Sequence, residues 1–275
     1  MSTNNSLAKE KIKILLLEGV HQSAVEELKA KGYTNIEYYK SSLAESELIE
    51  KIADVHFIGI RSRTQLTDNV LSHAKKLVAI GCFCIGTNQV ELPAAQKRGI
   101  PVFNAPFSNT RSVAELVLGE TLLLLRGIPE KSAQAHRGIW NKSAVGSVEA
   151  RGKTLGIIGY GHLGQSVARI AHAFDMNVLI AERHNQPTIR DDRLPLEEVL
   201  RQSDIISLHC PLTPDTKHLI NNKTLSLMKS SAMLINTARG DIINHNDLVN
   251  AIEQQQIAYA VLDVLEQEPP SESHP

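Results

Sequence analysis

Three glycines in the order Gly159-x-Gly161-x-x-Gly164 stand between an apolar run and an amphipathic stretch. This spacing suits a dinucleotide, because the first glycine permits a tight turn and the second lets backbone approach the phosphates. The third glycine lets the following helix pack close to the preceding strand. His162 and Leu163 begin that helix and would present backbone N–H groups to an anion at its positive end. We predict that this loop binds the pyrophosphate of a dinucleotide.

An acidic residue follows at the spacing that such a site needs. Glu182 ends the next apolar strand, near the roughly 20-residue offset expected for the group that binds the adenosine ribose. A carboxylate there would repel the 2′-phosphate of NADP, so the sequence favours NAD. Arg183 and Arg190 lie close by and weaken this preference for NAD slightly.

Further polar residues follow apolar strands, where ligands bind in open α/β sheets. Arg239, in the run Thr237-Ala238-Arg239-Gly240, could form two parallel hydrogen bonds to a carboxylate. Asp263 could accept a hydrogen bond from a nicotinamide carboxamide, and Glu268 precedes a proline and could orient a histidine. His209 and Pro211 follow a third strand and are candidate cofactor-binding residues. Taken singly, each residue also has an ordinary structural explanation. Arg239 could form a surface ion pair, Asp263 and Glu268 could be solvated loop residues, and His209 could have a structural role.

The elements that must position these residues alternate between strand and helix over most of the chain. We predict an α/β protein with two doubly wound parallel-sheet domains, the first flavodoxin-like and the second a Rossmann domain. The predicted divisions are residues 1–104, a connecting helix and arm at 105–150, and residues 151–275. In the connecting part, Ser112 and Glu115 predict a capping box before an apolar helix, and an arm around Trp140 suggests a homodimer or homotetramer.

Composition narrows the function classes. The formal net charge of −1 offers no electrostatic basis for binding nucleic acid or a charged membrane surface. Cys82, Cys84 and Cys210 have neither the number of a disulfide framework nor the spacing of a zinc pair, so no metal site is predicted. The first residues lack an apolar signal core, and no run approaches the length of a membrane span. We expect a cytoplasmic protein.

Taken together, the motifs of the second domain resemble those of the D-isomer-specific 2-hydroxyacid dehydrogenase family. They are Gly159–Gly164, Ser207–Thr213, Met228–Asn244, Asp263-Val264 and Glu268-Pro269. The resemblance implies that NAD is the cofactor, that Thr237 and Ala238 contact it, and that Arg239 binds the substrate carboxylate and the reacting oxygen.

Stretches of the first domain narrow the resemblance to members that oxidise 3-phospho-D-glycerate to 3-phosphohydroxypyruvate, the first step of L-serine biosynthesis. They are Arg61–Thr64, Gly81–Val90 and Phe103–Glu115. The resemblance implies that backbone N–H groups of Cys84, Ile85 and Gly86 bind the carboxylate, and that Asn109 lines the same site. Arg61 and Arg63 would bind the phosphate, since a dianion needs fixed cations.

The sequence departs from the family near its end. The family's general base is a histidine 20 to 25 residues beyond the glutamate, in a Pro-His-x-Gly-Gly turn, and no such turn occurs before Pro275. His274 lies too close to Glu268 and lacks the glycines. We therefore expect a C-terminally truncated chain that lacks the last Rossmann strand and the return helix, and that is a fragment or inactive.

Two other functions remain open at this point. One is a different D-2-hydroxyacid dehydrogenase, such as a glyoxylate, hydroxypyruvate or 2-oxoglutarate reductase, which would need fewer cations at Arg61 and Arg63. The other is a non-catalytic NAD-sensing scaffold, against which the presence of Arg239 and Glu268 argues.

Overall fold

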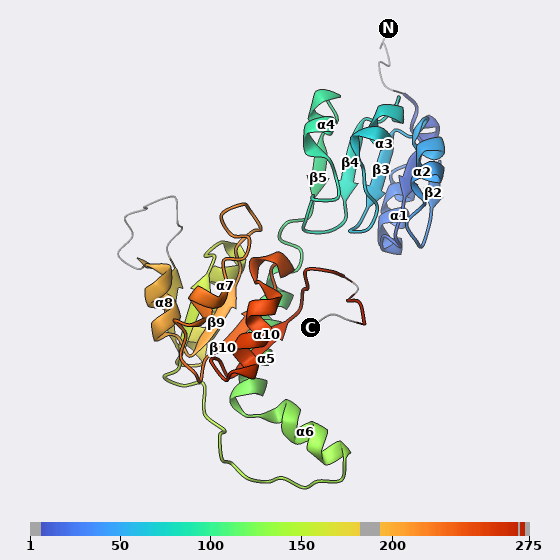
Figure 1. The fold of residues 1–275 in the computed structure, drawn as a ribbon. Coiled ribbons are helices and arrows are strands. Elements are labelled where there is room, and N and C mark those ends of the chain that lie inside the picture. Colours follow the sequence, from blue (N-terminus) through green and yellow to red (C-terminus); the bar gives the residue numbers. More distant parts are fainter. Residues whose placement is uncertain (1–6, 182–192, 269, 273–275) are drawn as a thin grey trace. The chain divides into compact units, whose positions relative to one another are not determined.

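The fold was obtained as a computed structural model, which describes residues 7–181, 193–268 and 270–272. The chain forms two compact units, Met1–Ser108 and Asn109–Pro275. Figure 1 shows the elements of each unit. Among the described residues, no helix combines the length and apolar character that a membrane span requires.

The first unit is built on a five-stranded parallel sheet of order β2-β1-β3-β4-β5. This is the flavodoxin-like order, which confirms the predicted fold class for this unit. Its strands are β1 (Ile14–Leu16), β2 (Ile36–Tyr38), β3 (Phe57–Ile60), β4 (Ala79–Cys82) and β5 (Val102–Asn104). Its helices are η1 (Lys9–Lys11), α1 (Gln22–Ala30), α2 (Glu45–Ile52), α3 (Asp68–His73) and α4 (Leu92–Lys97).

The second unit contains a six-stranded parallel sheet of order β11-β10-β9-β6-β7-β8. Its strands are β6 (Thr154–Ile158), β7 (Asn177–Ala181), β8 (Arg193–Leu194), β9 (Ile205–Leu208), β10 (Met233–Asn236) and β11 (Tyr259–Leu262). Numbered from β6, the order is 3-2-1-4-5-6, the dinucleotide-binding arrangement.

This sheet differs from the expected one in its number of strands. The sequence predicts that the last strand is missing, whereas the described sheet has six strands in the 3-2-1-4-5-6 order. The strand missed from sequence is β8, whose two residues are too short to show a period. Within the described residues no helix follows β11.

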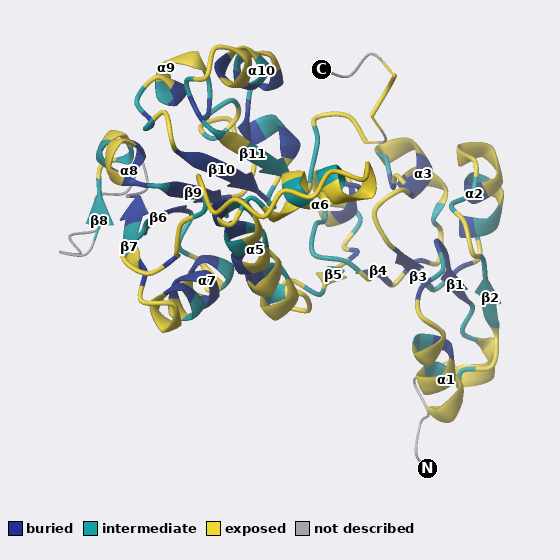
Figure 2. Cartoon of the chain, turned by 90° about the horizontal axis from the view of Figure 1, so that it is seen from below, coloured by how far each residue is buried: buried dark blue, intermediate teal, exposed yellow. Residues whose placement is uncertain are grey.

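Helices cover both faces of the second sheet because its strands are apolar on both sides. Neighbouring residues of β6 face opposite ways: Ile157 packs in a cluster with α5 and α7, and Ile158 packs in a cluster with α8, α9 and α10. In Figure 2 the strands β9 and β10 are buried along their length, and β6 is buried beyond its first residue. The helices are α5 (Thr110–Leu125), α6 (Ile128–His136), α7 (His162–Ala173), α8 (Leu196–Gln202), α9 (Asn222–Leu225), η2 (Gly240–Ile242) and α10 (His245–Glu253).

The connecting helix predicted from sequence lies within the second unit, where α5 packs against α7. The unit begins at Asn109, beyond the predicted division after residue 104. The predicted capping box is wrong, because α5 begins at Thr110 with Asn109 as its N-cap. The Glu115 carboxylate pairs instead with the Arg111 guanidinium, one turn earlier on the helix.

Candidate functional site

The glycine loop of the second unit has the geometry that its spacing predicts. Gly159 directly follows β6 and has a φ of 101°, a left-handed conformation that disfavours a side chain. A Cβ at Gly159 would lie 2.5 Å from the backbone nitrogen of Cys210 and 2.5 Å from the carbonyl carbon of His209. The turn therefore requires glycine because it contacts the backbone that follows β9.

The other two glycines have different roles. Gly161 borders space that a ligand could occupy, and Gly164 is required for close packing. Gly161 is the N-cap of α7 without a side-chain hydrogen bond, and a Cβ there would meet nothing within 4 Å. A Cβ at Gly164 would overlap the carbonyl oxygen of Gly159 and lie 3.2 Å from the Ile157 side chain. Open space thus lies beside Gly161, at the helix end where His162 and Leu163 begin α7. This arrangement fits a pyrophosphate at a positive helix end.

His209 lies beside the glycine loop, and its side chain is half-buried. Its backbone N–H donates to the carbonyl of Ile158 at 2.7 Å, and its Nε2 lies 2.9 Å from the Ser207 hydroxyl. Burial lowers the pKa of His209 to about 4. Its Nδ1 is buried and has no hydrogen-bond partner in the structure. A buried polar atom without a partner is costly, so this edge can supply a hydrogen bond to a ligand. Pro211 follows, and its carbonyl accepts the Thr216 hydroxyl at 2.6 Å.

Arg239 is presented by a turn that a buried asparagine holds. Asn236 ends β10, donates through Nδ2 to the carbonyl of Arg239 at 2.9 Å, and accepts the Ala238 N–H at 3.0 Å. Arg239 is exposed and its Nη1 donates to the Ala238 carbonyl at 2.7 Å. The Thr237 hydroxyl is buried without a partner in the structure. The turn therefore offers a guanidinium and a hydroxyl at the carboxyl edge of the sheet.

The loop after β11 lies directly against this turn. A Cβ at Gly240 would overlap the backbone of Leu265 and Glu266. The Asp263 N–H donates to the Asn236 carbonyl at 3.0 Å, and the Glu268 carboxylate accepts the Leu265 N–H at 3.0 Å. The fold thus brings the arginine turn and the acidic loop together, and Glu268 helps to shape its own loop.

Glu182 lies outside the described residues. Its predicted contact with the adenosine ribose stays a prediction. Asn109 is described and belongs to the second unit as the N-cap of α5. Its predicted role near Cys84 also stays a prediction.

In the first unit, Glu18 holds the loop that carries the two predicted phosphate-binding arginines. Its carboxylate accepts the backbone N–H groups of Arg61 at 3.1 Å, Arg63 at 2.8 Å and Thr64 at 2.9 Å. Burial by itself would raise the pKa of Glu18, but the Thr64 hydroxyl and these N–H donors outweigh it and lower the pKa below 4.5. The loop is therefore anchored by an ionised, buried carboxylate.

The side chains of Arg61 and Arg63 are exposed on this anchored loop. In the described part of the chain their guanidinium groups form no hydrogen bond or ion pair. Both groups are therefore available to an anionic ligand, and their predicted contact with a phosphate stays a prediction.

A second buried polar residue, Gln89, joins that loop to residues 84–86. Its amide nitrogen lies 2.6 Å from the Arg61 carbonyl and 3.2 Å from the Gly86 carbonyl. The Cys84 thiol lies 3.2 Å from the Gly86 carbonyl. The Cys84 thiol thus lies within a polar loop, and the predicted carboxylate contact of its backbone N–H stays a prediction. The Ile85 carbonyl accepts the Asn104 side chain at 2.7 Å.

Four residues of these sites were not predicted from the sequence: Glu18, Gln89, Asn236 and Glu120. The first three position the loops, and Glu18 could have been suspected because it lies two residues after the buried strand β1. Glu120 lies on α5, where burial and the charge of Asp263 raise its pKa. Because Glu120 lies in an apolar helix, the sequence did not indicate this electrostatic interaction with Asp263.

Known proteins are similar to this chain in sequence and in fold. Residues 118–275 match the family model "D-isomer specific 2-hydroxyacid dehydrogenase, NAD binding domain". The chain is 55% identical over 272 residues to D-3-phosphoglycerate dehydrogenase of Escherichia coli (strain K12). It is 50% identical over 260 residues to D-3-phosphoglycerate dehydrogenase 1 of Saccharomyces cerevisiae (strain ATCC 204508 / S288c).

These matches cover nearly all of the chain but only part of the relatives. They include 98% of this chain and 66% of the Escherichia coli protein, and 94% of this chain and 55% of the yeast protein.

Solved structures agree with the fold. The TT0316 protein from Thermus thermophilus has a TM-score of 0.87 and 33% identity, covering 96% of this chain and 85% of its own. A D-lactate dehydrogenase from Aquifex aeolicus, solved with NAD and lactic acid, has a TM-score of 0.81 and 28% identity. That match covers 93% of this chain and 78% of the other.

Proposed function

The chain belongs to the D-isomer-specific 2-hydroxyacid dehydrogenase family, and we propose that it oxidises 3-phospho-D-glycerate to 3-phosphohydroxypyruvate with NAD. This reaction is the first step of L-serine biosynthesis. The observation that carries the substrate assignment is the pair of unpartnered guanidinium groups, Arg61 and Arg63, on a loop anchored by Glu18. A phosphate dianion needs such fixed cations, whereas an uncharged substrate end does not.

Each group of residues has a separate binding role in this proposal. The glycine loop and the N-terminus of α7 would hold the pyrophosphate of NAD, which would accept the hydride from the substrate while the hydroxyl proton is released to solvent. Arg239 binds the substrate carboxylate and the oxygen that becomes the ketone, because its guanidinium can form two parallel hydrogen bonds. Arg61 and Arg63 bind the phosphate. Asn236 and Glu18 hold these arginines by fixing the turns on which they stand.

Ligand binding tests the substrate without requiring proton transfer. With NADH present, 3-phospho-D-glycerate should bind more tightly than D-glycerate or 2-oxoglutarate in titration calorimetry. Equal binding of D-glycerate would favour a dehydrogenase of non-phosphorylated acids, and NAD binding without any acid would favour a scaffold. Substrate-dependent formation of NADH, followed by absorbance, tests the reaction itself.

Removing both phosphate-binding charges should separate substrate binding from cofactor binding. In the double variant R61Q/R63Q we expect the affinity for 3-phospho-D-glycerate to fall by about 10- to 100-fold, because two charge-assisted contacts are lost. The affinities for NAD and D-glycerate should change little. Titration calorimetry measures all three, and K75Q/K76Q is a matched control that removes two exposed positive charges from the same unit. An unchanged affinity in R61Q/R63Q would contradict the assignment.

We also propose that the protein forms a homodimer or homotetramer through α6 and residues 137–149. This segment extends away from the rest of its unit in Figure 1 and is largely exposed in Figure 2. It carries large apolar side chains in solvent, including Ile139 at 53%, Trp140 at 83% and Val145 at 90% exposure. Covering such a surface with the same segment of a second copy would remove it from water.

Sedimentation measurements test this assembly. The variant W140S/V145S should dissociate at protein concentrations at which the wild type stays associated. L212S, which alters a 41% exposed leucine elsewhere in the unit, is the control. A wild-type chain that sediments as a monomer would overturn the proposal.

We also propose a cytoplasmic location, because Cys82, Cys84 and Cys210 are free thiols. Cell fractionation tests this location.

A further inference from the structure

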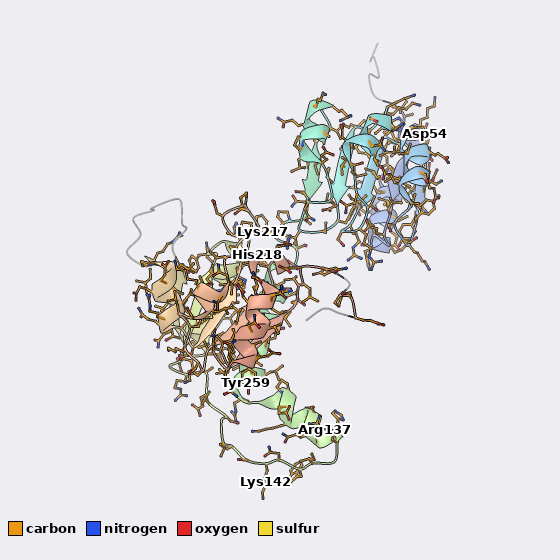
Figure 3. All side chains as sticks on the ribbon, viewed as in Figure 1. Asp54, Arg137, Lys142, Lys217, His218 and Tyr259 are labelled. Atoms are coloured by element: carbon orange, nitrogen blue, oxygen red, sulfur yellow. The ribbon has the colours of Figure 1, made fainter. Side chains whose placement is uncertain are left out.

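Three side chains from separate loops of the second unit converge at the carboxyl edge of its sheet. His218 follows β9, Asp241 lies in η2 after β10, and Glu266 follows β11. One ligand atom from each lies within 4.8 Å of the other two. His218 Nε2 is 3.0 Å from Glu266 Oε1. Figure 3 shows Lys217 and His218 at the opposite end of this unit from Tyr259, the first residue of β11.

The backbone fixes these loops against one another. The His218 N–H donates to the Asp241 carbonyl at 2.8 Å, and the Ile220 N–H donates to the Ile242 carbonyl at 3.0 Å. The close approach of Gly240 to the backbone of Leu265 joins the third loop to the second. The three side chains are therefore brought together by main-chain contacts, and the 3.0 Å contact between two of them is not what assembles the loops.

The charges of this cluster are only partly balanced. Asp241 and Glu266 are both acidic, and the Lys217 ammonium lies 3.6 Å from Asp241. Behind Glu266, the buried His245 places its Nδ1 3.9 Å from the second carboxylate oxygen. An imidazole nitrogen and two carboxylate oxygens, with a further histidine behind one carboxylate, form a donor set typical of divalent zinc-class ions.

We propose that His218, Asp241 and Glu266 bind a divalent cation of the zinc class, with a remaining coordination position taken by water. Ligand bonds of about 2.0–2.2 Å would require the three donor atoms to move by roughly 1 Å or less. Their side chains are 36–40% exposed, which leaves them room for that adjustment. The imidazole–carboxylate contact would be replaced by two bonds to the metal.

The cation would have a structural role and would take no part in hydride transfer. Asp241 and Glu266 each stand two residues from a proposed active-site residue, Arg239 and Glu268 respectively. A metal that joins their loops would stabilise the arrangement of that edge. This inference does not depend on which acid the protein oxidises.

The experiment titrates chelator-treated protein with Zn²⁺ alone in a calorimeter, and with Co²⁺ while visible absorption is recorded. We expect saturable binding of one Zn²⁺, a higher melting temperature with the metal, and Co²⁺ bands typical of four or five ligands. Single variants H218Q and E266Q should each weaken binding by at least about 10-fold, while circular dichroism confirms folding.

Matched controls locate the site. H172Q alters an exposed histidine of the same unit, and C84S removes a thiol that could bind zinc elsewhere. Both should bind Zn²⁺ as the wild type does. Absence of saturable binding, or equal affinity in the wild type, H218Q and E266Q, would overturn the proposal and leave the cluster as an ion pair.

Discussion

Replacement of Gly161 by valine should abolish measurable NAD binding while leaving the free energy of unfolding nearly unchanged. The reason is that a Cβ at this position meets no protein atom within 4 Å. Its φ of −83° and ψ of −160° are accessible to any residue. The space is empty of protein but lies at the helix end where the pyrophosphate must approach backbone N–H groups. We expect a loss of affinity of about 100-fold or more, which corresponds to roughly 3 kcal/mol.

Two other glycines make this experiment decisive. G164A should unfold or strongly destabilise the protein, because its Cβ would overlap the Gly159 carbonyl oxygen. G119A adds a methyl group to an exposed, unobstructed position of α5 and should raise stability by about 0.5–1 kcal/mol without affecting NAD. Calorimetric NAD titration and chemical denaturation measure both quantities. Normal NAD affinity in G161V would rule out the glycine loop as the pyrophosphate site.

The second large effect is expected at Glu18. The variant E18Q should lose about 2–3 kcal/mol of stability and E18A about 3–5 kcal/mol, because buried N–H groups lose an ionised acceptor. In E18Q an amide nitrogen would face either the Arg63 N–H or the N–H groups of Arg61 and Thr64, so two donors would oppose each other. The loop would relax, and we expect affinity for 3-phospho-D-glycerate to fall by about 10-fold with NAD affinity unchanged.

The pH dependence of this effect has a defined sign. The folded pKa of Glu18 is lowered from 4.5, so its stabilising contribution is present above that value and is lost as the pH falls through the folded pKa. The stability difference between wild type and E18Q should therefore be largest near neutral pH and shrink below about pH 4.5. Urea denaturation across this range measures it, with E50Q as the control for an exposed glutamate. A difference that does not change with pH would mean that the carboxylate charge is not what anchors the loop.

Much of the fold could be read from local patterns. The alternation of strand and helix predicted two parallel sheets, and the glycine spacing placed the turn between β6 and α7. These predictions succeeded because each depends on residues near one another in the chain. The two-residue strand β8 and the start of α5 at Thr110 were missed for the same reason. Their positions depend on pairing with β7 and on packing against α7.

The sequence by itself determined which residues could do chemistry: the glycines, Arg239, Arg61 and Arg63. Only the tertiary structure decided what holds them, since Glu18 reaches a loop more than forty residues away and Gln89 joins two loops. It also decided that His218, Asp241 and Glu266 meet. The physical reason is that parallel strands deliver their carboxyl ends to one edge, whatever their separation along the chain. Hydrogen bonds between such loops leave no periodic signal in the sequence.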